Sequence, residues 1–150
     1  MKILLATISS KRTPASGPAT TLLESYLERS GRYSSIAHRV FASEATFLSF
    51  LEDTTSRTRP ALLLTDSRGK QLSSEELAAS IARLRDSGTQ QLILAIGPAD
   101  GWSTAALKRA DLTLAFGRIT LPHELAAVVA AEQIYRALTI LAGHPYHCGH

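Results

Sequence analysis

The 150-residue chain has only one cysteine, Cys148, so no disulfide can form within it. A small secreted fold held together by disulfides is therefore excluded, and a reducing compartment is expected. Glycine and proline are also scarce, at 9 and 6 residues, which is too few for a disordered or fibrous chain. Hydrophobic residues make up 45% of the chain, enough to bury a core without cross-links. These values indicate a single ordinary domain over residues 1–150.

Long hydrophobic runs are missing as well. The longest candidate, residues 125–142, is interrupted by Glu132 and Arg136, so no membrane-spanning helix is expected. The apolar residues 3–8 are followed at once by the polar residues 9–12, which is too early for a secretory signal peptide. We therefore expect a cytoplasmic protein.

Charge of one sign is only slightly in excess, with a net charge of +3 that lies in the first part of the chain. Residues 1–60 hold eight Lys and Arg against five acidic residues, whereas residues 61–150 hold eight of each. A basic segment suits contact with phosphate, because cations that neutralise phosphates release bound counterions. A solvated surface explains the same excess, so charge alone leaves the partner open.

Apolar strand-like runs alternate with segments of helical periodicity along the whole chain. The predicted strands are residues 3–8, 33–41, 61–65, 91–96 and 112–116. The predicted helices lie around residues 22–31, 47–51, 73–88, 103–109 and 122–142, and the predicted polar segments are 9–18, 53–60, 66–70 and 97–101. This alternation predicts an α/β domain with a mostly parallel sheet and helices on both faces.

Ligands of such sheets bind at the carboxyl ends of the strands, which directs attention to residues 65–70, 97–102 and 116–122. The second of these loops carries Gly97 and Gly101, so a ligand could approach bare backbone there. An ordinary tight turn explains the same glycines. The loop has neither the dinucleotide-binding pattern nor the lysine of a phosphate loop, so a phosphate-splitting site is not supported.

The tail gathers three histidines and the cysteine, namely His144, His147, Cys148 and His150. Zinc sites use these residue types, but a structural site needs four ligands on a framework, and no second cluster exists elsewhere in the sequence. We therefore expect no resident metal, and only adventitious capture of metal by the tail.

Two residues on the predicted helix 122–142 leave alternatives open. Arg136 interrupts an apolar stretch and requires an anion, which is either its i−4 neighbour Glu132 or a phosphate. His123, at the start of the helix, either caps it or contacts a ligand, and its position disfavours the protonated imidazole.

Five motifs in the second half of the chain resemble one family closely. They are RGKQLSSEEL at residues 68–77, AIGPADGWS at 95–103, FGRITLPHEL at 116–125, AEQIYRAL at 131–138 and GHPYH at 143–147. In this order and spacing, over about residues 60–147, they resemble the small bacterial ribosomal RNA methyltransferases that methylate N3 of a pseudouridine in 23S RNA.

The resemblance implies a SPOUT-type domain with a C-terminal trefoil knot. Members are homodimers that bind S-adenosylmethionine in the knot and act on the assembled ribosome, with no metal. The matched cofactor-binding positions are Thr65, Gly97, Phe116, Gly117, Arg118, Ile119, Thr120 and Leu121. The resemblance also assigns RNA binding and catalysis to Tyr146 and His147, beside the cofactor of the partner subunit. His147 is then the candidate base, and Arg136 or Tyr146 positions the RNA.

Two other functions remain alternatives at this point. Pro98 stands where the family usually has a second glycine, and the tail ends in residues 148–150 rather than in Lys or Arg. These departures suit a ribosome- or RNA-binding protein without methyl transfer. The glycine loop on its own is also compatible with a small domain that senses some other nucleotide.

Overall fold

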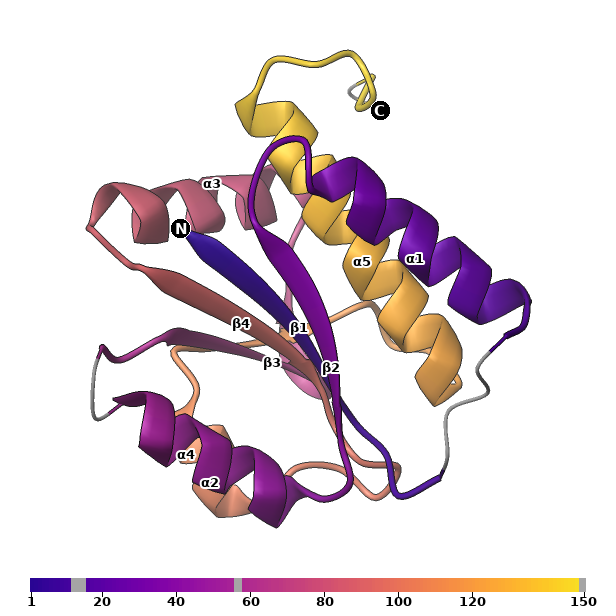
Figure 1. Cartoon of the computed structure of the whole chain (residues 1–150), viewed down its shortest axis with the longest axis vertical. Coiled ribbons are helices and arrows are strands. Elements are labelled where there is room, and N and C mark those ends of the chain that lie inside the picture. Colours follow the sequence, from indigo (N-terminus) through magenta and orange to yellow (C-terminus); the bar gives the residue numbers. More distant parts are fainter. Residues whose placement is uncertain (12–15, 56–57, 149–150) are drawn as a thin grey trace.

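The computed structural model describes residues 1–11, 16–55 and 58–148, in which strands and helices alternate (Figure 1). The strands are β1 (Lys2–Ile8), β2 (Ile36–Phe41), β3 (Ala61–Gln71), β4 (Gln91–Ile96) and β5 (Leu112–Ala115). The helices are α1 (Pro18–Ser30), α2 (Glu44–Thr55), α3 (Ser74–Asp86), α4 (Thr104–Arg109) and α5 (His123–Leu141).

The five strands form one parallel sheet in the order β2-β1-β4-β3-β5. Six consecutive residues of β1 and five of β4 are buried, because both strands lie inside the sheet and both of its faces are covered. The predicted parallel α/β fold is confirmed. Its strand order also makes β3 the direct neighbour of both β4 and β5, so that Thr65 of β3 lies beside Ile96 at the end of β4 and beside Leu114 near the end of β5.

Helices cover both faces of the sheet, as Figure 1 shows. On one face, α1, α3 and α5 bury residues such as Leu23, Ile81 and Ile134 against the sheet. On the other face, α2 and α4 bury Phe47 and Ala106. The predicted two-sided arrangement is therefore confirmed, and each face has its own apolar core.

One predicted boundary is wrong in a way that matters for the site. The polar residues 66–70 were expected to leave the sheet, but β3 continues to Gln71. After an irregularity that begins at Thr65, β3 pairs with β5 a second time, through Lys70 and Gln71. The segment is held by backbone pairing rather than by side-chain burial, so its polar sequence gave no sign of a strand.

Other elements are shifted by a few residues. The predicted loop 53–60 begins too early, because α2 continues to Thr55. The helix predicted around residues 22–31 already starts at Pro18, whose fixed φ angle suits a first turn. Residues 56–57, and residues 12–15 of the predicted loop 9–18, lie outside the described residues.

The second pairing of β3 with β5 depends on a close backbone approach at Gly69. A Cβ atom at this position would lie only 2.6 Å from the carbonyl carbon of Leu114. Backbone cannot yield to such a contact without a shift of the strand, so only glycine fits here.

We therefore expect Gly69→Ala to destabilise the fold by at least about 2 kcal/mol, since overpacking against backbone is costly. Thermal unfolding followed by circular dichroism at equal protein concentrations would show Tm lowered by several degrees. Lys70→Ala is the matched control, because its side chain is exposed and only its backbone pairs with β5. Equal Tm values for the two variants would contradict the importance of the close approach.

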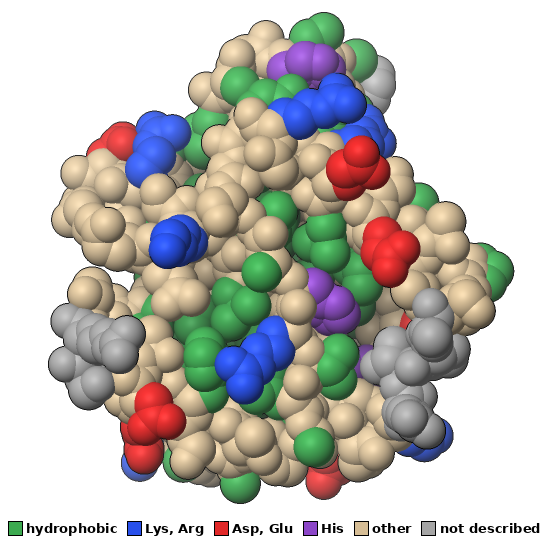
Figure 2. All heavy atoms as spheres, viewed as in Figure 1, with side chains coloured by type: hydrophobic (Ala, Val, Ile, Leu, Met, Phe, Trp, Pro, Cys, Tyr) green, Lys and Arg blue, Asp and Glu red, His purple; other side chains and the backbone are tan. Residues whose placement is uncertain are grey.

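The surface gives little further guidance. On the face shown in Figure 2, Lys and Arg side chains lie in separate small groups, so this face has no continuous basic surface. None of the helices described is both long and apolar enough to cross a membrane.

Candidate active site

An open cavity of about 210 Å³ lies at the carboxyl ends of β4 and β5, beside residues 65–67 in the middle of β3. We call it the β3–β5 cavity. It brings together seven of the eight predicted cofactor-binding residues: Thr65, Gly97, Phe116, Gly117, Ile119, Thr120 and Leu121. Arg118 lies in the same segment but is exposed and is not part of the lining. The three segments singled out from the sequence therefore converge on one place, although the first of them belongs to β3 and is not a loop.

Trp102 contacts both Thr65 of β3 and Gly97 in the loop after β4. Its indole Nε1 donates a hydrogen bond of 2.9 Å to the carbonyl of Thr65. The same ring lies so close to Gly97 that a Cβ atom there would be 2.7 Å from Nε1. Trp102 is buried, at 6% exposure, and the centroid of its ring lies 5.7 Å from that of Phe47. The loop after β4 is therefore held against the core.

The hydroxyl of Thr65 has a structural partner. It donates to the carbonyl of Ala95 on the neighbouring strand β4, at 3.1 Å. The loop after β4 is closed by a turn in which the N–H of Gly101 donates to the carbonyl of Pro98, at 2.9 Å. Thr65 and Pro98 are therefore both accommodated by the local backbone.

The third wall of the cavity is formed by residues 117–121, which belong to neither a helix nor a strand. Gly117 has a φ angle of +110°, a conformation that favours glycine. Ile119 is 73% exposed, which is unusual for a large apolar side chain beside a cavity. This wall therefore presents backbone polar groups together with an uncovered apolar side chain.

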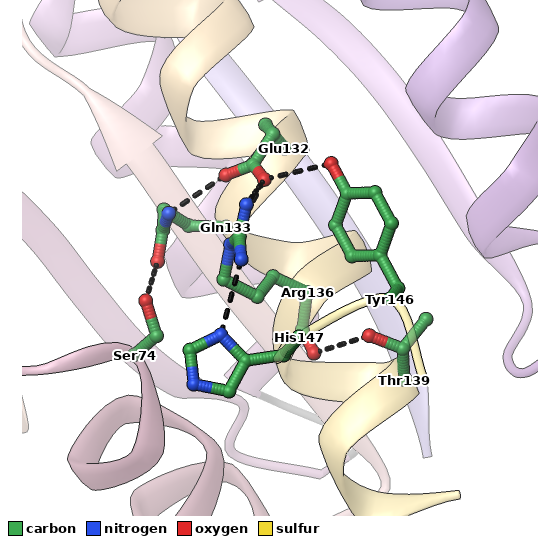
Figure 3. A network of polar contacts seen from close by, with 7 residues as sticks. All are labelled: Ser74, Glu132, Gln133, Arg136, Thr139, Tyr146 and His147. Atoms are coloured by element: carbon green, nitrogen blue, oxygen red, sulfur yellow. Dashed lines mark hydrogen bonds and ion pairs between the residues drawn. The ribbon is translucent and has the colours of Figure 1, made fainter. Parts of the chain in front are cut away.

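The predicted catalytic residues form a separate network around Glu132 of α5 (Figure 3). The carboxylate of Glu132 accepts hydrogen bonds from Nε of Arg136 at 2.9 Å and from the hydroxyl of Tyr146 at 2.9 Å. Gln133 donates to the same carboxylate at 2.7 Å and accepts from Ser74 of α3 at 2.8 Å. The structure thus brings Arg136, Tyr146 and His147 together. Glu132 contacts the first two directly, and His147 is linked to it through Arg136.

Aromatic packing holds the tail in the same place. The ring of Tyr146 lies edge-on to that of Tyr135, with 4.6 Å between their centroids. The guanidinium of Arg136 lies 4.8 Å from the centre of the Tyr146 ring. Burial, followed by its hydrogen bonds to Tyr26 and Glu132, raises the pKa of Tyr146, so its hydroxyl stays protonated as a donor.

Both ring nitrogens of His147 are engaged. Nη1 of Arg136 lies 3.1 Å from Nδ1, and the Glu75 carboxylate lies 2.7 Å from Nε2. Arginine can only donate, so Nδ1 of His147 accepts and Nε2 donates to Glu75. In this conformation the lone pair of His147 is occupied, and the imidazole can take up a proton only after Arg136 moves away.

The pKa of Glu75 is lowered from 4.5 to about 2, first by the hydrogen bond from His147 and then by hydrogen bonds from its own backbone and from Ser73. A depressed carboxylate pKa means that the contact supports the folded tail at pH values above 4.5 and is lost as the pH falls toward 2. We expect the Glu75 carboxyl carbon to titrate near pH 2 in NMR spectra of the wild-type protein, and at a higher pH that stays below 4.5 in His147→Ala, because the backbone hydrogen bond and Ser73 still lower the pKa. An unchanged titration in the variant would show that His147 does not cause the shift.

The tail network and the β3–β5 cavity do not share a residue within one chain. A groove of about 390 Å³ lies between them, lined by Phe116 and Gly117 from the cavity and by Ser74 and Gln133 from the network. The predicted catalytic and cofactor-binding residues are therefore neighbours in the fold but not parts of one pocket.

The structure shows which partners Arg136 and His123 contact, for which the sequence left two possibilities each. Arg136 pairs with Glu132, as its i−4 spacing predicts. Burial lowers the pKa of His123, while a hydrogen bond to the Gly97 carbonyl opposes this effect. His123 therefore contacts a residue of the β3–β5 cavity, and its neutral form is favoured more by burial than by its place on the helix.

Sequence reasoning missed two contributors to these sites. Trp102 has no predicted role, although a single tryptophan next to a glycine loop is a usable signal. Glu75 lies 72 residues from its partner His147, so no local pattern could pair them. Across the described residues, no three His, Cys, Asp or Glu side chains gather in a way that could hold a metal ion.

A family model described as "Predicted SPOUT methyltransferase" matches residues 1–147. The chain belongs to the SPOUT methyltransferase family. Within it, the chain belongs with the proteins named ribosomal RNA large subunit methyltransferase H, as the motifs indicated. The protein of that name from Koribacter versatilis is 52% identical over 130 residues, which cover 87% of this chain and 88% of the relative.

A second relative of the same name, from Brucella ovis, is 57% identical over 93 residues. These residues cover 62% of this chain and 55% of the relative, so the match spans about half the length of the Brucella protein. A solved SPOUT-type neighbour is the SpoU methyltransferase AviRb from Streptomyces viridochromogenes, in complex with the cofactor AdoMet. It has a TM-score of 0.50 and 14% identity, and covers 95% of this chain and 58% of AviRb. This likeness supports the SPOUT-type fold, while the trefoil knot itself stays a prediction.

Proposed function

We propose that the protein is an S-adenosylmethionine-dependent methyltransferase that methylates N3 of a pseudouridine in 23S rRNA. It acts in the cytoplasm, as a homodimer, on the assembled ribosome. The observation that carries this proposal is the convergence of three motif-bearing segments on the β3–β5 cavity. The names of the relatives, which specify large-subunit ribosomal RNA, support the substrate, and the AdoMet complex of AviRb supports the cofactor.

The residues of the β3–β5 cavity fit an adenosyl group. Within the described residues, the backbone of 117–121 forms no hydrogen bond with other protein groups, so it can pair with the edge of an adenine. Phe116, Ile119 and Leu121 supply apolar surface for the ring, and Gly97 lets a ligand approach the backbone after β4. The high exposure of Ile119 is then relieved when a ligand covers it.

The separation of the tail network from the cavity supports action as a homodimer. A tail that does not line its own cavity can complete the cavity of a second subunit, as the family resemblance implies. In that arrangement, Arg136, Tyr146 and His147 of one subunit face the methyl donor held by the other. Light scattering on the purified protein is expected to give twice the chain mass.

The reaction requires a deprotonated imide nitrogen in line with an electrophilic methyl group, which the bound cofactor supplies. As the imide loses its proton, negative charge develops on the two flanking carbonyl oxygens. The guanidinium of Arg136 is placed to stabilise that charge. Glu132 holds the guanidinium in position through two of its nitrogens.

His147 serves as the base once Arg136 turns to the substrate. The movement breaks the contact between Arg136 and Nδ1, which frees the lone pair to accept the imide proton. The resulting imidazolium is stabilised by Glu75 at Nε2, as in other acid–base pairs with a carboxylate behind the imidazole. The movement of Arg136 thus couples substrate contact to activation of the base.

The proposal is tested by supplying methyl-labelled cofactor and ribosomes that lack the modification. Label is expected at N3 of one pseudouridine of 23S rRNA, and free RNA fragments serve as the negative control. Calorimetry with S-adenosylmethionine tests the competing function, a protein that binds ribosomes without methyl transfer. Absence of cofactor binding together with retained ribosome binding would favour that competitor.

His147→Ala is expected to slow the single-turnover methylation rate by roughly 100-fold, the usual contribution of a positioned general base. Glu75→Gln is expected to have a smaller effect, because it leaves the imidazole in place. If His147→Ala methylates as fast as the wild type, His147 is not the base.

A further inference from the structure

A second cavity, of about 280 Å³, lies at the carboxyl end of β1 between the first turns of α1 and α5. We call it the histidine cavity, after His38 and His123, which line it together with Thr7, Leu23 and Ala127. Its volume is just below the range of drug-sized pockets, and its lining is mainly apolar, so it suits a flat ring the size of a nucleobase. No step of the proposed mechanism uses this cavity.

His123 contributes an unused hydrogen-bond acceptor. Its Nε2 is buried and, among the residues that the structure describes, has no hydrogen-bond partner. A hydrogen bond to the backbone of Gly97 raises the pKa of the ring, against the larger effect of burial. Assigning the ring proton to Nδ1 leaves Nε2 with a lone pair that only an N–H or O–H group can satisfy. A buried polar atom without a partner costs free energy, so its presence beside a cavity points to a ligand that donates a proton.

The second histidine keeps the cavity neutral. Nε2 of His38 lies 3.0 Å from the hydroxyl of Thr7, so that side chain is already paired. Burial lowers the pKa of both histidines, and their proximity lowers that of His38 further. Both shifts favour the neutral imidazole, the form in which one ring nitrogen of His123 can accept a hydrogen bond.

The histidine cavity is connected to the β3–β5 cavity. His123 also borders a groove of about 700 Å³ whose lining continues through Pro98 and Trp102. These two residues line the β3–β5 cavity as well. Gly97 links the two sites directly, since it lines one cavity and its carbonyl holds His123 of the other.

We propose that the histidine cavity receives the pseudouridine base and that Nε2 of His123 accepts a hydrogen bond from its N1–H. This N–H distinguishes pseudouridine from uridine, which has a C5–H at the corresponding ring position. N1 and N3 flank the same carbonyl, so a base held through N1 leaves N3 free to face the methyl donor. Lys11, exposed at the rim, supplies a cation for the nucleotide phosphate.

This inference rests on the proposed function for the identity of the base, but it concerns selection between two pyrimidines rather than methyl transfer. A site built to pair with an N–H rejects an analogue that lacks it, because the buried acceptor is then left unpaired. His123 is therefore a specificity residue, which acts before and independently of the chemical step.

The experiment measures the binding of pseudouridine 5′-monophosphate and uridine 5′-monophosphate to the full chain without cofactor. NMR spectra of the imidazole groups follow each titration into the millimolar range. Pseudouridine monophosphate is expected to bind at least tenfold more tightly and to shift the signals of His38 and His123. Equal affinities, shifts confined to the β3–β5 cavity, or no binding of either nucleotide would overturn the proposal.

Three variants test the assignment further. His123→Leu removes the acceptor and is expected to bind both nucleotides equally, whereas His123→Gln, whose amide oxygen can accept, is expected to restore part of the preference. Ala19→Leu fills the cavity and is expected to weaken both nucleotides. A preference that survives in His123→Leu would exclude the assignment.

Cofactor titration of the same variants separates this inference from the proposed function. Retained binding of S-adenosylmethionine with lost pseudouridine selection supports both. Absence of cofactor binding in the wild type would defeat the proposed methyl transfer and leave the selection of nucleotides as a separate result.

Discussion

Gly97→Ala is expected to weaken binding of S-adenosylmethionine by at least 100-fold. A Cβ atom at this position would lie 2.7 Å from Nε1 and 2.8 Å from Cε2 of the Trp102 ring. The indole cannot withdraw, because it is buried and donates to the Thr65 carbonyl. The added carbon must therefore displace the loop after β4 into the cavity, and calorimetry would record the loss of affinity.

A compensating change tests this explanation. Phenylalanine lacks the part of the indole that approaches Gly97, so the double variant Gly97→Ala/Trp102→Phe is expected to regain part of the lost affinity. Circular dichroism would establish that each variant is folded. If Gly97→Ala bound the cofactor as tightly as the wild type, the loop after β4 would not belong to the cofactor site.

Arg136→Met is expected to lower the single-turnover rate of methyl transfer by about 100-fold or more, with the cofactor affinity of the wild type. Removal of one donor to developing negative charge commonly has an effect of this size. Arg136 does not line the β3–β5 cavity, so cofactor binding has no reason to change. The rate is measured with ribosomes that lack the modification.

Arg83→Met is the matched control for this variant. Arg83 is an exposed arginine of α3 whose Nη2 contacts only Ser80 among the hydrogen bonds found. It is expected to methylate at the wild-type rate. A large loss of cofactor affinity in Arg136→Met would instead indicate that the tail supports the cofactor site structurally.

The sheet and its order of elements could be predicted because local patterns carry them. The apolar runs in β1 and β4 predict strands that are buried on both sides, and a helix is predicted from residue 73, where the structure has the capping box of Ser73 and Glu76 at the start of α3. The convergence of the three segments followed from the general location of ligand sites in parallel sheets. These features depend on residues that are neighbours in the sequence.

The features that could not be predicted depend on distant pairs. The extension of β3 to Gln71 exists because Leu114 and Ala115 offer it a second pairing, and exposed polar side chains gave no periodic signal. The histidine cavity needs His38 from β2 and His123 from α5 on the same side of the sheet. The residues next to either histidine in the sequence do not indicate that the two lie close together in the fold.

The position of Trp102 gives the protein a built-in optical reporter. It is the only tryptophan of the chain, so the intrinsic fluorescence excited at the red edge of the absorption band comes from this one indole. The ring lies against Gly97 and donates a hydrogen bond to the Thr65 carbonyl. A ligand in the β3–β5 cavity should therefore change the fluorescence emission of Trp102. Ligand association could therefore be followed in real time on unlabelled protein, and each loop substitution could be compared by the same signal.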